Sequence, residues 1–323
     1  MDITHLTRRF SRHALARPNL AYYVWRYVAN AGRTGRMLIG RMSDSDVRAI
    51  ARELNTEGIV VGLADRFLTA EGRRALGAAA ARIVERSSSE EVEAVVRGTG
   101  GDADRQKEFL VHLVSYPDGM PADDALLKLA LDTKLLEIVA SHLGLWPCLH
   151  SVGAWLNYPT DAPPELSQLW HRDPEDLKLI KVFVYLIDVD ARCGPFTYIP
   201  RTHPFGADAA TSPKLERKKR MPDERMTRFF APGRWRVCTG PANTMIIADT
   251  VGYHRGGKPV AGKRILITLT YTSGSPISRR DLWVQHMPGW ISSGIQKAAV
   301  RPLLVGPQPA RKNGEKKGKK TRI

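Results

Sequence analysis

Hydrophobic and polar positions repeat with two different periods along the chain, and the period changes near Pro147. Before that point, apolar residues recur every three to four positions, which is the period of a helix with one buried face. After it, the apolar runs are short and bounded by Gly, Pro, Asp or Asn, which is typical of strands. The pattern predicts helices first and a β-rich core second.

The first part contains three predicted helices and one short strand. Residues 44–58 form a helix with acidic residues at its start and a glycine at its end, and residues 69–87 form a second helix opened by a threonine. Residues 58–62 form a short strand between them. The span 87–104 is a loop with a piece of helix. Residues 123–143 carry too many apolar positions for a narrow stripe, so they form one largely buried helix.

Six apolar runs with β-character follow, at residues 151–158, 179–189, 196–200, 234–240, 244–251 and 264–272. Several short strands at this spacing predict a sandwich or a barrel. No composition shift separates the helical part from the β-rich part as an independent domain. The helices are therefore expected to brace one face of the β-core, and the fold class is mainly β with α.

The length and composition exclude several classes of protein. With 323 residues and 43% hydrophobic residues, the chain can bury a sizeable core. Its apolar runs fall short of the roughly 18 residues of a membrane span, and no secretory signal is readable, so a cytoplasmic location is expected. Three cysteines without a CxxC pair argue against a disulfide framework and a thiolate zinc site.

The formal net charge of +16 is concentrated at the two ends. Residues 1–52 carry ten basic and three acidic side chains, and residues 301–323 carry eight and one. We expect a basic helical extension at 1–42, the main domain at 43–300 and a disordered basic tail at 301–323. The extension lies on its own domain or on anionic lipid, the first being preferred. Weak contact of the basic ends with a membrane surface, peripheral to it, fits this charge, and specific nucleic-acid binding is not expected.

Candidate chemistry lies in the β-rich half. His171 and Asp173 form a His-x-Asp triplet in WHRDPED, and alternate residues of an extended segment point to the same side. His254 follows the apolar run 244–251, so it lies at a strand end. Two histidines and one carboxylate can bind Fe(II) and leave coordination positions open. Taken singly, each of these residues could equally be an ordinary loop or turn residue.

Arg264 begins the last apolar strand, RILITLTYT. An arginine that points inward from such a strand needs an anionic partner to offset its desolvation, and a guanidinium can hold a carboxylate through two hydrogen bonds. His203, which stands beside Pro204, is a candidate ligand by residue type. His112, His142 and His150 are interpreted as core or surface residues with ordinary hydrogen bonds.

Three segments together resemble the phytanoyl-CoA dioxygenase family of Fe(II)/2-oxoglutarate oxygenases: WHRD, IKVFVYLIDVDARCGPFTYIPRTHPFG and YHRGGKPVAGKRILITLTY. The resemblance covers about residues 45–275 and is strongest over 168–271. It implies a double-stranded β-helix, of the jelly-roll or cupin-like type, with helices packed on one sheet. It also implies Fe(II) as cofactor, 2-oxoglutarate as cosubstrate and O2 as oxidant.

The resemblance assigns roles to individual residues. The positions that match the iron ligands are His171, Asp173 and His254, and Arg264 matches the residue that binds the distal carboxylate of 2-oxoglutarate. Asn157 and Tyr185 fall near positions that line the cosubstrate pocket. For His203, the resemblance implies a structural turn residue and not a ligand.

Two positions bear on the chemistry that the resemblance implies. Many members have Ser or Thr at the position of Gly256, where it touches 2-oxoglutarate, so the contact is incomplete here. A carboxylate at Asp173, in place of Ala or Gly, disfavours halogenation.

The predicted function is that of a dioxygenase that hydroxylates an aliphatic carbon of a small or lipid-like molecule. Other oxidative outcomes at the same ligand set stay open. Residues 211–230, TSPKLERKKRMPDERMTRFF, are either a basic lid that favours an anionic substrate or a solvated loop. The alternative function, kept open by Gly256, is a catalytically silent metal-binding β-helix docked to membrane or nucleic acid through its basic ends.

Overall fold

The computed structural model describes residues 18–39, 44–98, 105–107, 109–213, 220–280 and 282–304. The α-helices in these residues are α2 (Pro18–Val24), α3 (Ala31–Ile39), α4 (Ser45–Glu57), α5 (Ala64–Phe67), α6 (Ala70–Ser87), α7 (Glu90–Val96), α8 (Ala125–Ala130), α9 (Thr133–Leu143), α10 (Asp223–Met226) and α11 (Gly294–Val300). The strands are β1 (Ile59–Leu63), β2 (Arg105–Lys107), β3 (Leu110–His112), β4 (Cys148–Asn157), β5 (Ile180–Tyr185), β6 (Phe196–Tyr198), β7 (Arg236–Cys238), β8 (Thr244–Ala248), β9 (His254–Gly256) and β10 (Arg264–Thr272). Short π and 3-10 turns are η2 (Trp25–Ala29), η4 (Leu166–Gln168), η5 (Ala191–Cys193), η6 (Pro232–Arg234) and η7 (Arg301–Leu303).

The strands form two antiparallel sheets. The large sheet has the order β1-β8-β5-β10-β4-β3-β2, and the small sheet has the order β7-β6-β9. A bridge between His171 and His254 adds the HRD segment to the free side of β9. From β5 to β10 the chain passes repeatedly between the two sheets, so β1, β8, β5, β10 and β4 are neighbours in the large sheet although none of these pairs is consecutive in sequence. This order is that of a double-stranded β-helix, and the predicted fold class is confirmed.

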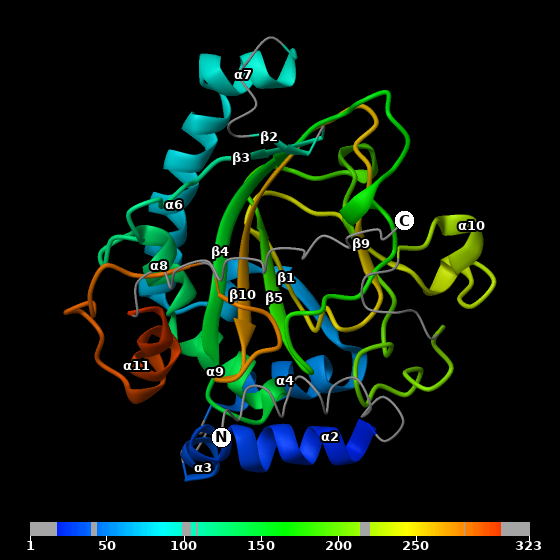
Figure 1. The fold of residues 1–323 in the computed structure, drawn as a ribbon. Coiled ribbons are helices and arrows are strands. Elements are labelled where there is room, and N and C mark those ends of the chain that lie inside the picture. Colours follow the sequence, from blue (N-terminus) through cyan, green and yellow to red (C-terminus); the bar gives the residue numbers. More distant parts are fainter. Residues whose placement is uncertain are drawn as a thin grey trace, which may run out of the picture.

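The two faces of the large sheet pack against different partners. On β10, Ile265 and Ile267 belong to the main hydrophobic core with the helices, whereas Leu266 belongs to a smaller core between the sheets. Because side chains alternate across a strand, Arg264 shares the inner face with Leu266. Helices α6, α8 and α11 lie on one side of the large sheet and β9 on the other (Figure 1). The predicted bracing of one sheet by helices is therefore observed.

Local signals placed the first helices correctly. Asp44 caps α4 by accepting a hydrogen bond from the Asp46 amide, and Gly58 ends the helix with φ of 76°, a left-handed conformation that favours glycine. Thr69 caps α6 by accepting from the Gly72 amide. Each of the six predicted β-runs contains a strand, and β2, β3 and β9 were not predicted.

The prediction of a single helix over 123–143 is wrong. Helix α8 ends at Ala130, and α9 begins at Thr133. Asp132 separates them because its carboxylate accepts hydrogen bonds from the Leu135 amide and from the Thr69 hydroxyl, 3.0 and 2.5 Å away. An aspartate that caps a helix in this way competes with continuation of the preceding one.

The N-terminal helices pack on the domain. Trp25 is buried, and its indole N–H donates to Asp176 Oδ1 at 2.8 Å. Arg33 donates to the carbonyls of Trp146 and Pro147. Residues 18–39 therefore follow the first of the two predicted placements. Residues 1–17 lie outside the described residues, and the membrane contact of the basic ends stays a prediction.

The start of the predicted disordered tail is wrong. Residues 301–304 are part of the fold: Leu303 is fully buried and its carbonyl accepts from the Val284 amide at 2.8 Å. Residues 305–323, which hold most of the tail's basic side chains, lie outside the described residues. All three cysteines are free. Among the helices that the structure describes, none is long and apolar enough to cross a membrane.

Candidate metal centre

His171 and His254 are brought together by the backbone. Each amide donates to the other's carbonyl, at 2.9 and 3.1 Å, in an antiparallel bridge between the HRD segment and β9. Such a bridge sets the two side chains next to each other, and their ring centroids are 4.2 Å apart. His171 and His254, which are 83 positions apart in sequence, are thus brought into one site by a single strand pairing.

One nitrogen of each imidazole is fixed by a backbone carbonyl. His171 Nδ1 donates to the Leu169 carbonyl at 2.8 Å, and His254 Nδ1 donates to the Gly252 carbonyl at 3.0 Å. Since a carbonyl can only accept, Nδ1 carries the proton and Nε2 presents a lone pair. This is the tautomer and the orientation that metal-binding histidines commonly have.

Asp173 completes the cluster. Its amide donates to the Thr250 carbonyl at 2.9 Å, and its carboxylate lies 3.7 Å from His171 Nε2 and 3.3 Å from His254 Nε2. The three ligand atoms all lie within 4.8 Å of one another, and the three residues are buried. Two imidazole nitrogens and one carboxylate oxygen on one side of a space fit a divalent transition metal of the facial-triad type. The structure thus brings together the three predicted ligands.

The charge state of the cluster also suits a metal. Burial, with His254 beside it, holds the pKa of His171 well below its ordinary value. Burial opposes ionisation of Asp173, but Lys181 and the two imidazoles outweigh it and hold the pKa of that carboxyl well below its usual range. A neutral imidazole and an ionised carboxylate are the forms that coordinate metals.

Lys181 was missed by the sequence analysis. Its ammonium lies 2.8 Å from Asp173 Oδ2 and 2.9 Å from Glu175 Oε1. The sequence contained a signal for this residue. Lys181, Phe183 and Tyr185 alternate along β5 and so share its inner face, and a charge on the inner face of such a strand needs an oppositely charged partner.

Arg264 lies opposite Asn157 in the pairing of β10 with β4. The guanidinium is 5% exposed, and Nη2 donates to Asn157 Oδ1 at 3.3 Å. Nε and Nη1 are buried without a hydrogen-bond partner, and no described carboxylate forms an ion pair with this side chain. A buried cation left in this condition costs stability, so the arrangement fits a carboxylate ligand supplied from outside.

Gly256 lies against Arg264. A Cβ built on Gly256 would be 3.0 Å from Arg264 Nη2, which is tighter than an ordinary van der Waals contact. Gly256 is two residues from His254 on β9, so the guanidinium adjoins the face of β9 that carries the metal ligand. The departure from the family pattern at this position therefore leaves room for Arg264.

Tyr185 uses its hydroxyl within the protein. The hydroxyl donates to the Cys238 carbonyl at 2.9 Å and accepts from the Phe196 amide at 3.0 Å, which links the two sheets. Its ring belongs to the core between the sheets. The roles of Tyr185 and Asn157 as cosubstrate contacts stay predictions.

The apolar surroundings of the cluster come from the small sheet. The Phe196 ring stacks 5.6 Å from that of His254 and 4.4 Å from that of Phe183. His203 lies outside the ligand cluster, and its Nε2 donates to the Asn55 carbonyl at 3.1 Å.

Residues 220–230 pack beside the metal ligands. Trp170, the neighbour of His171, donates its amide to the Met221 carbonyl and its indole N–H to Asp223 Oδ1, at 2.9 and 2.8 Å. Arg255, the neighbour of His254, forms an ion pair with the same carboxylate at 2.8 Å. The end of the predicted basic segment is thus fixed in place, whereas residues 214–219 lie outside the described part of the chain.

Comparison with known proteins found similar solved structures only. No family model matches the chain, and no curated protein matches it. Similar structures include EctD from S. alaskensis with 2-oxoglutarate and 5-hydroxyectoine, at 18% identity over 80% of this chain and 89% of that one, with a TM-score of 0.47. Another is the epimerase SnoN in complex with Fe3+, alpha ketoglutarate and nogalamycin RO, at 16% identity over 76% and 92%, with a TM-score of 0.47. A third is the non-heme monooxygenase ThoJ in its apo form, at 19% over 71% and 80%, with a TM-score of 0.43.

These identities and TM-scores are low, so the fold assignment rests on the strand order and the site on its own geometry. The resemblance to the phytanoyl-CoA dioxygenase family stays a prediction.

Proposed function

We propose that the chain is a non-haem Fe(II)/2-oxoglutarate-dependent oxygenase. One observation carries the proposal: a buried cluster of two imidazole Nε2 atoms and a carboxylate adjoins a buried guanidinium with two unpaired nitrogens. A metal site alone would need only the cluster. The unpaired Arg264 adds the requirement for an anion bound next to it, which a dicarboxylate cosubstrate meets.

Each residue has a role that its contacts support. His171, Asp173 and His254 would hold Fe(II), because their ligand atoms converge and their other polar atoms are bonded to the backbone or to Lys181. Arg264, oriented by Asn157, would hold the distal carboxylate of 2-oxoglutarate. Lys181 keeps Asp173 ionised and turned towards the imidazoles.

Fe(II) with bound 2-oxoglutarate supplies the oxidation of an unactivated C–H bond by O2, with conversion of the cosubstrate to succinate and CO2. The protein contributes position and exclusion of water. The Phe196 ring stacks on His254 and is backed by Phe183, so apolar groups adjoin this side of the cluster and would disfavour water there. Because the three ligand atoms converge, a metal held by them would keep its remaining positions for reactants.

Hydroxylation of an aliphatic carbon of a small or lipid-like substrate is the reaction we infer for this site. An anionic group on the substrate would suit the basic segment 211–230, whose last residues are anchored to Trp170 beside His171.

An anaerobic titration of the full chain with Fe(II) and 2-oxoglutarate tests the proposal. The parent protein should develop a visible metal-to-ligand charge-transfer band when both are present. Asp173→Ala should lose the band, and Arg264→Ala should need much more 2-oxoglutarate to reach it. Arg225→Ala, which removes an exposed arginine on α10, is the matched control and should behave like the parent.

Two results would count against the proposal. Absence of the band in a parent protein shown to contain one Fe(II) per chain would exclude 2-oxoglutarate chelation and favour the silent binding module. A band without succinate formation on exposure to O2 would retain the cosubstrate site and exclude oxygenase activity.

A further inference from the structure

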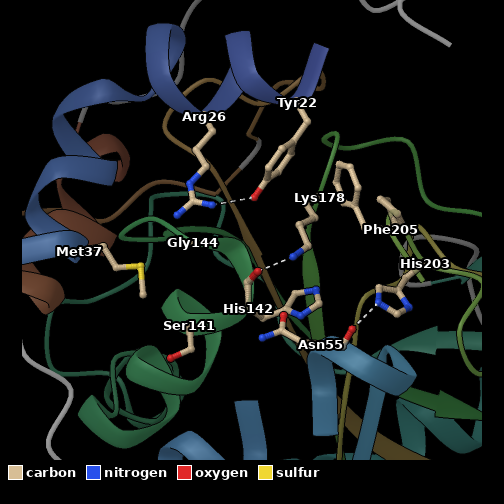
Figure 2. A pocket seen from close by; sticks show the side chains of 11 residues that line it. Tyr22, Arg26, Met37, Asn55, Ser141, His142, Gly144, Lys178, His203 and Phe205 are labelled. Atoms are coloured by element: carbon tan, nitrogen blue, oxygen red, sulfur yellow. Dashed lines mark hydrogen bonds between the residues drawn. The ribbon is translucent and has the colours of Figure 1, made fainter. Parts of the chain in front are cut away.

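A second cavity lies outside the β-helix, between the N-terminal helix α2 and the domain. Its volume is about 380 Å³, and Figure 2 shows its walls. The lining residues come from α2, η2, α3, α4, the C-terminal end of α9, the segment before β5 and the loop after β6, and none of them is a candidate metal ligand. The cavity is therefore a separate site from the metal centre.

The cavity is lined by cations and by no carboxylate. Lys178 is 7% exposed, and its ammonium donates to the His142 carbonyl at the end of α9. No described carboxylate forms an ion pair with Lys178, although an ammonium has two further N–H groups to satisfy. Burial lowers the pKa of Lys178 to about 8, which reflects the cost of a desolvated charge.

Arg26 supplies the second cation from the opposite wall. Its Nη1 donates to the Tyr22 hydroxyl at 3.3 Å, and its Nε is buried without a partner. In Figure 2 the Arg26 and Lys178 side chains both extend into the space between α2 and α9. Two cations that approach one cavity from different elements repel each other unless an anion lies between them.

His142 forms part of the floor. Its Nε2 lies 2.9 Å from Asp249 Oδ2, and both side chains are fully buried. The other nitrogen, Nδ1, is buried without a partner. The Asp249 carboxylate is not among the groups that line the cavity, although its charge attracts Lys178 and opposes the effect of burial on the pKa of that lysine.

The remaining walls are partly apolar, and they also include the polar residues Asn55, Ser141 and His203. Tyr22 and Phe205 contact each other edge to face, with centroids 4.6 Å apart, and Met37 lies on the α3 side. A site with a few convergent polar groups and aromatic walls, in this range of volume, is typical of small-molecule binding.

We propose that this cavity binds a small organic anion, with its carboxylate or phosphate group between Lys178 and Arg26 and its apolar part against Tyr22 and Phe205. The ligand satisfies the unpaired N–H groups of both cations. The proposal does not depend on the function of the metal centre, because it rests on contacts outside the β-helix.

The test is isothermal titration calorimetry of the full chain with phenyl phosphate and, separately, with benzoate. Saturable binding of either probe is expected, and the probe that binds more tightly identifies the acid group. Lys178→Met and Arg26→Met should each weaken binding by about tenfold or more, as expected for the loss of one charge-assisted contact. Lys128→Met, which removes an exposed lysine on α8, should leave the affinity within about twofold of the parent value.

Arg264→Met distinguishes the cavity from the metal centre. Binding that is kept in Arg264→Met and weakened in Lys178→Met supports the proposal. Binding that is lost in Arg264→Met and kept in Lys178→Met overturns it, as does the absence of saturable binding of both probes. If Lys178→Met does not fold, as judged by circular dichroism, Arg26→Met at the partly exposed wall replaces it. Weakened binding in Arg26→Met then supports the proposal, and unchanged binding overturns it.

Discussion

The ammonium of Lys181 lies 2.8 Å from Asp173 Oδ2 and 2.9 Å from Glu175 Oε1, so one half-buried cation joins the candidate metal ligand to a second carboxylate. The two acidic residues are two positions apart, at the end of the HRD triplet and just after it, and Lys181 reaches them from the inner face of β5. Asp173 Oδ2 thus lies between Lys181 and His254 Nε2, 3.3 Å from the imidazole, while Oδ1 faces His171, so the lysine helps to fix the orientation of the carboxylate.

Loss of the Lys181 ammonium should weaken metal binding without removing a ligand. Lys181→Met leaves the Asp173 carboxylate free to rotate and raises its pKa, so the affinity for Fe(II) should fall by about 10- to 100-fold, the usual effect of removing a hydrogen-bonding partner of a ligand. Anaerobic calorimetric titration with Fe(II) measures it. Lys181→Arg should recover part of the loss, and Lys128→Met is the control. An unchanged affinity in Lys181→Met would show that the backbone alone positions Asp173.

Without 2-oxoglutarate, the guanidinium of Arg264, with two nitrogens unpaired, should lower the free energy of unfolding of the parent relative to a variant with an apolar side chain at this position. Arg264→Met removes a buried charge, so its melting temperature without 2-oxoglutarate should equal or exceed that of the parent. With Fe(II) present in both samples, added 2-oxoglutarate should raise the melting temperature of the parent and leave that of the variant nearly unchanged. Thermal unfolding under anaerobic conditions gives both values. A variant that melts well below the parent would mean that Arg264 stabilises the fold through contacts of its own.

The space kept by Gly256 should matter for the cosubstrate and not for the metal. Gly256→Ala places a Cβ 3.0 Å from Arg264 Nη2, so the guanidinium must shift by a few tenths of an ångström. We expect the affinity for 2-oxoglutarate to fall several-fold, since bidentate contacts depend on position. The affinity for Fe(II) should stay the same. Titration with 2-oxoglutarate, followed by the charge-transfer band, measures the first affinity, and calorimetric titration with Fe(II) measures the second. An equal loss of both affinities would argue against Arg264 as the residue that binds the cosubstrate.

Acid should destabilise the protein through His150. Burial, together with Arg280 and Lys181, lowers the pKa of this imidazole to about 4. An unfolded chain protonates histidine near pH 6.5, so between about pH 6.5 and 4 the unfolded state binds more protons than the folded state. The contribution of His150 to the free energy of unfolding is therefore complete above about pH 6.5 and is lost as the pH falls towards 4.

The variant His150→Gln tests this contribution by urea unfolding from pH 7.5 to 4.5. Its free energy of unfolding should fall less with acid than that of the parent. His286→Gln changes an exposed histidine and should follow the parent curve. Parallel curves for the parent and His150→Gln would show that the imidazole is not held neutral by burial.

The sequence by itself determined the elements that depend on neighbours along the chain. Helix α4 and helix α6 follow from caps and from the 3.6-residue period, and the strands follow from short apolar runs between turn residues. The candidate ligands His171 and Asp173 were also readable, because a His-x-Asp triplet before a strand is a local pattern. His254 and Arg264 could be added to the candidate site because a histidine at a strand end and an arginine at the start of the next strand follow the His-x-Asp triplet in that order along the chain.

The tertiary structure decided which distant groups became partners. The break at Asp132 depends on the Thr69 hydroxyl, which lies 63 residues away in sequence. The pairing of Lys181 with Asp173 depends on β5 facing the HRD segment across the space between the sheets. The cavity between Arg26 and Lys178 exists because α2 packs against the end of α9. Periods and caps are set by interactions within a few residues, whereas these contacts depend on sheet order and helix packing, which local patterns do not encode.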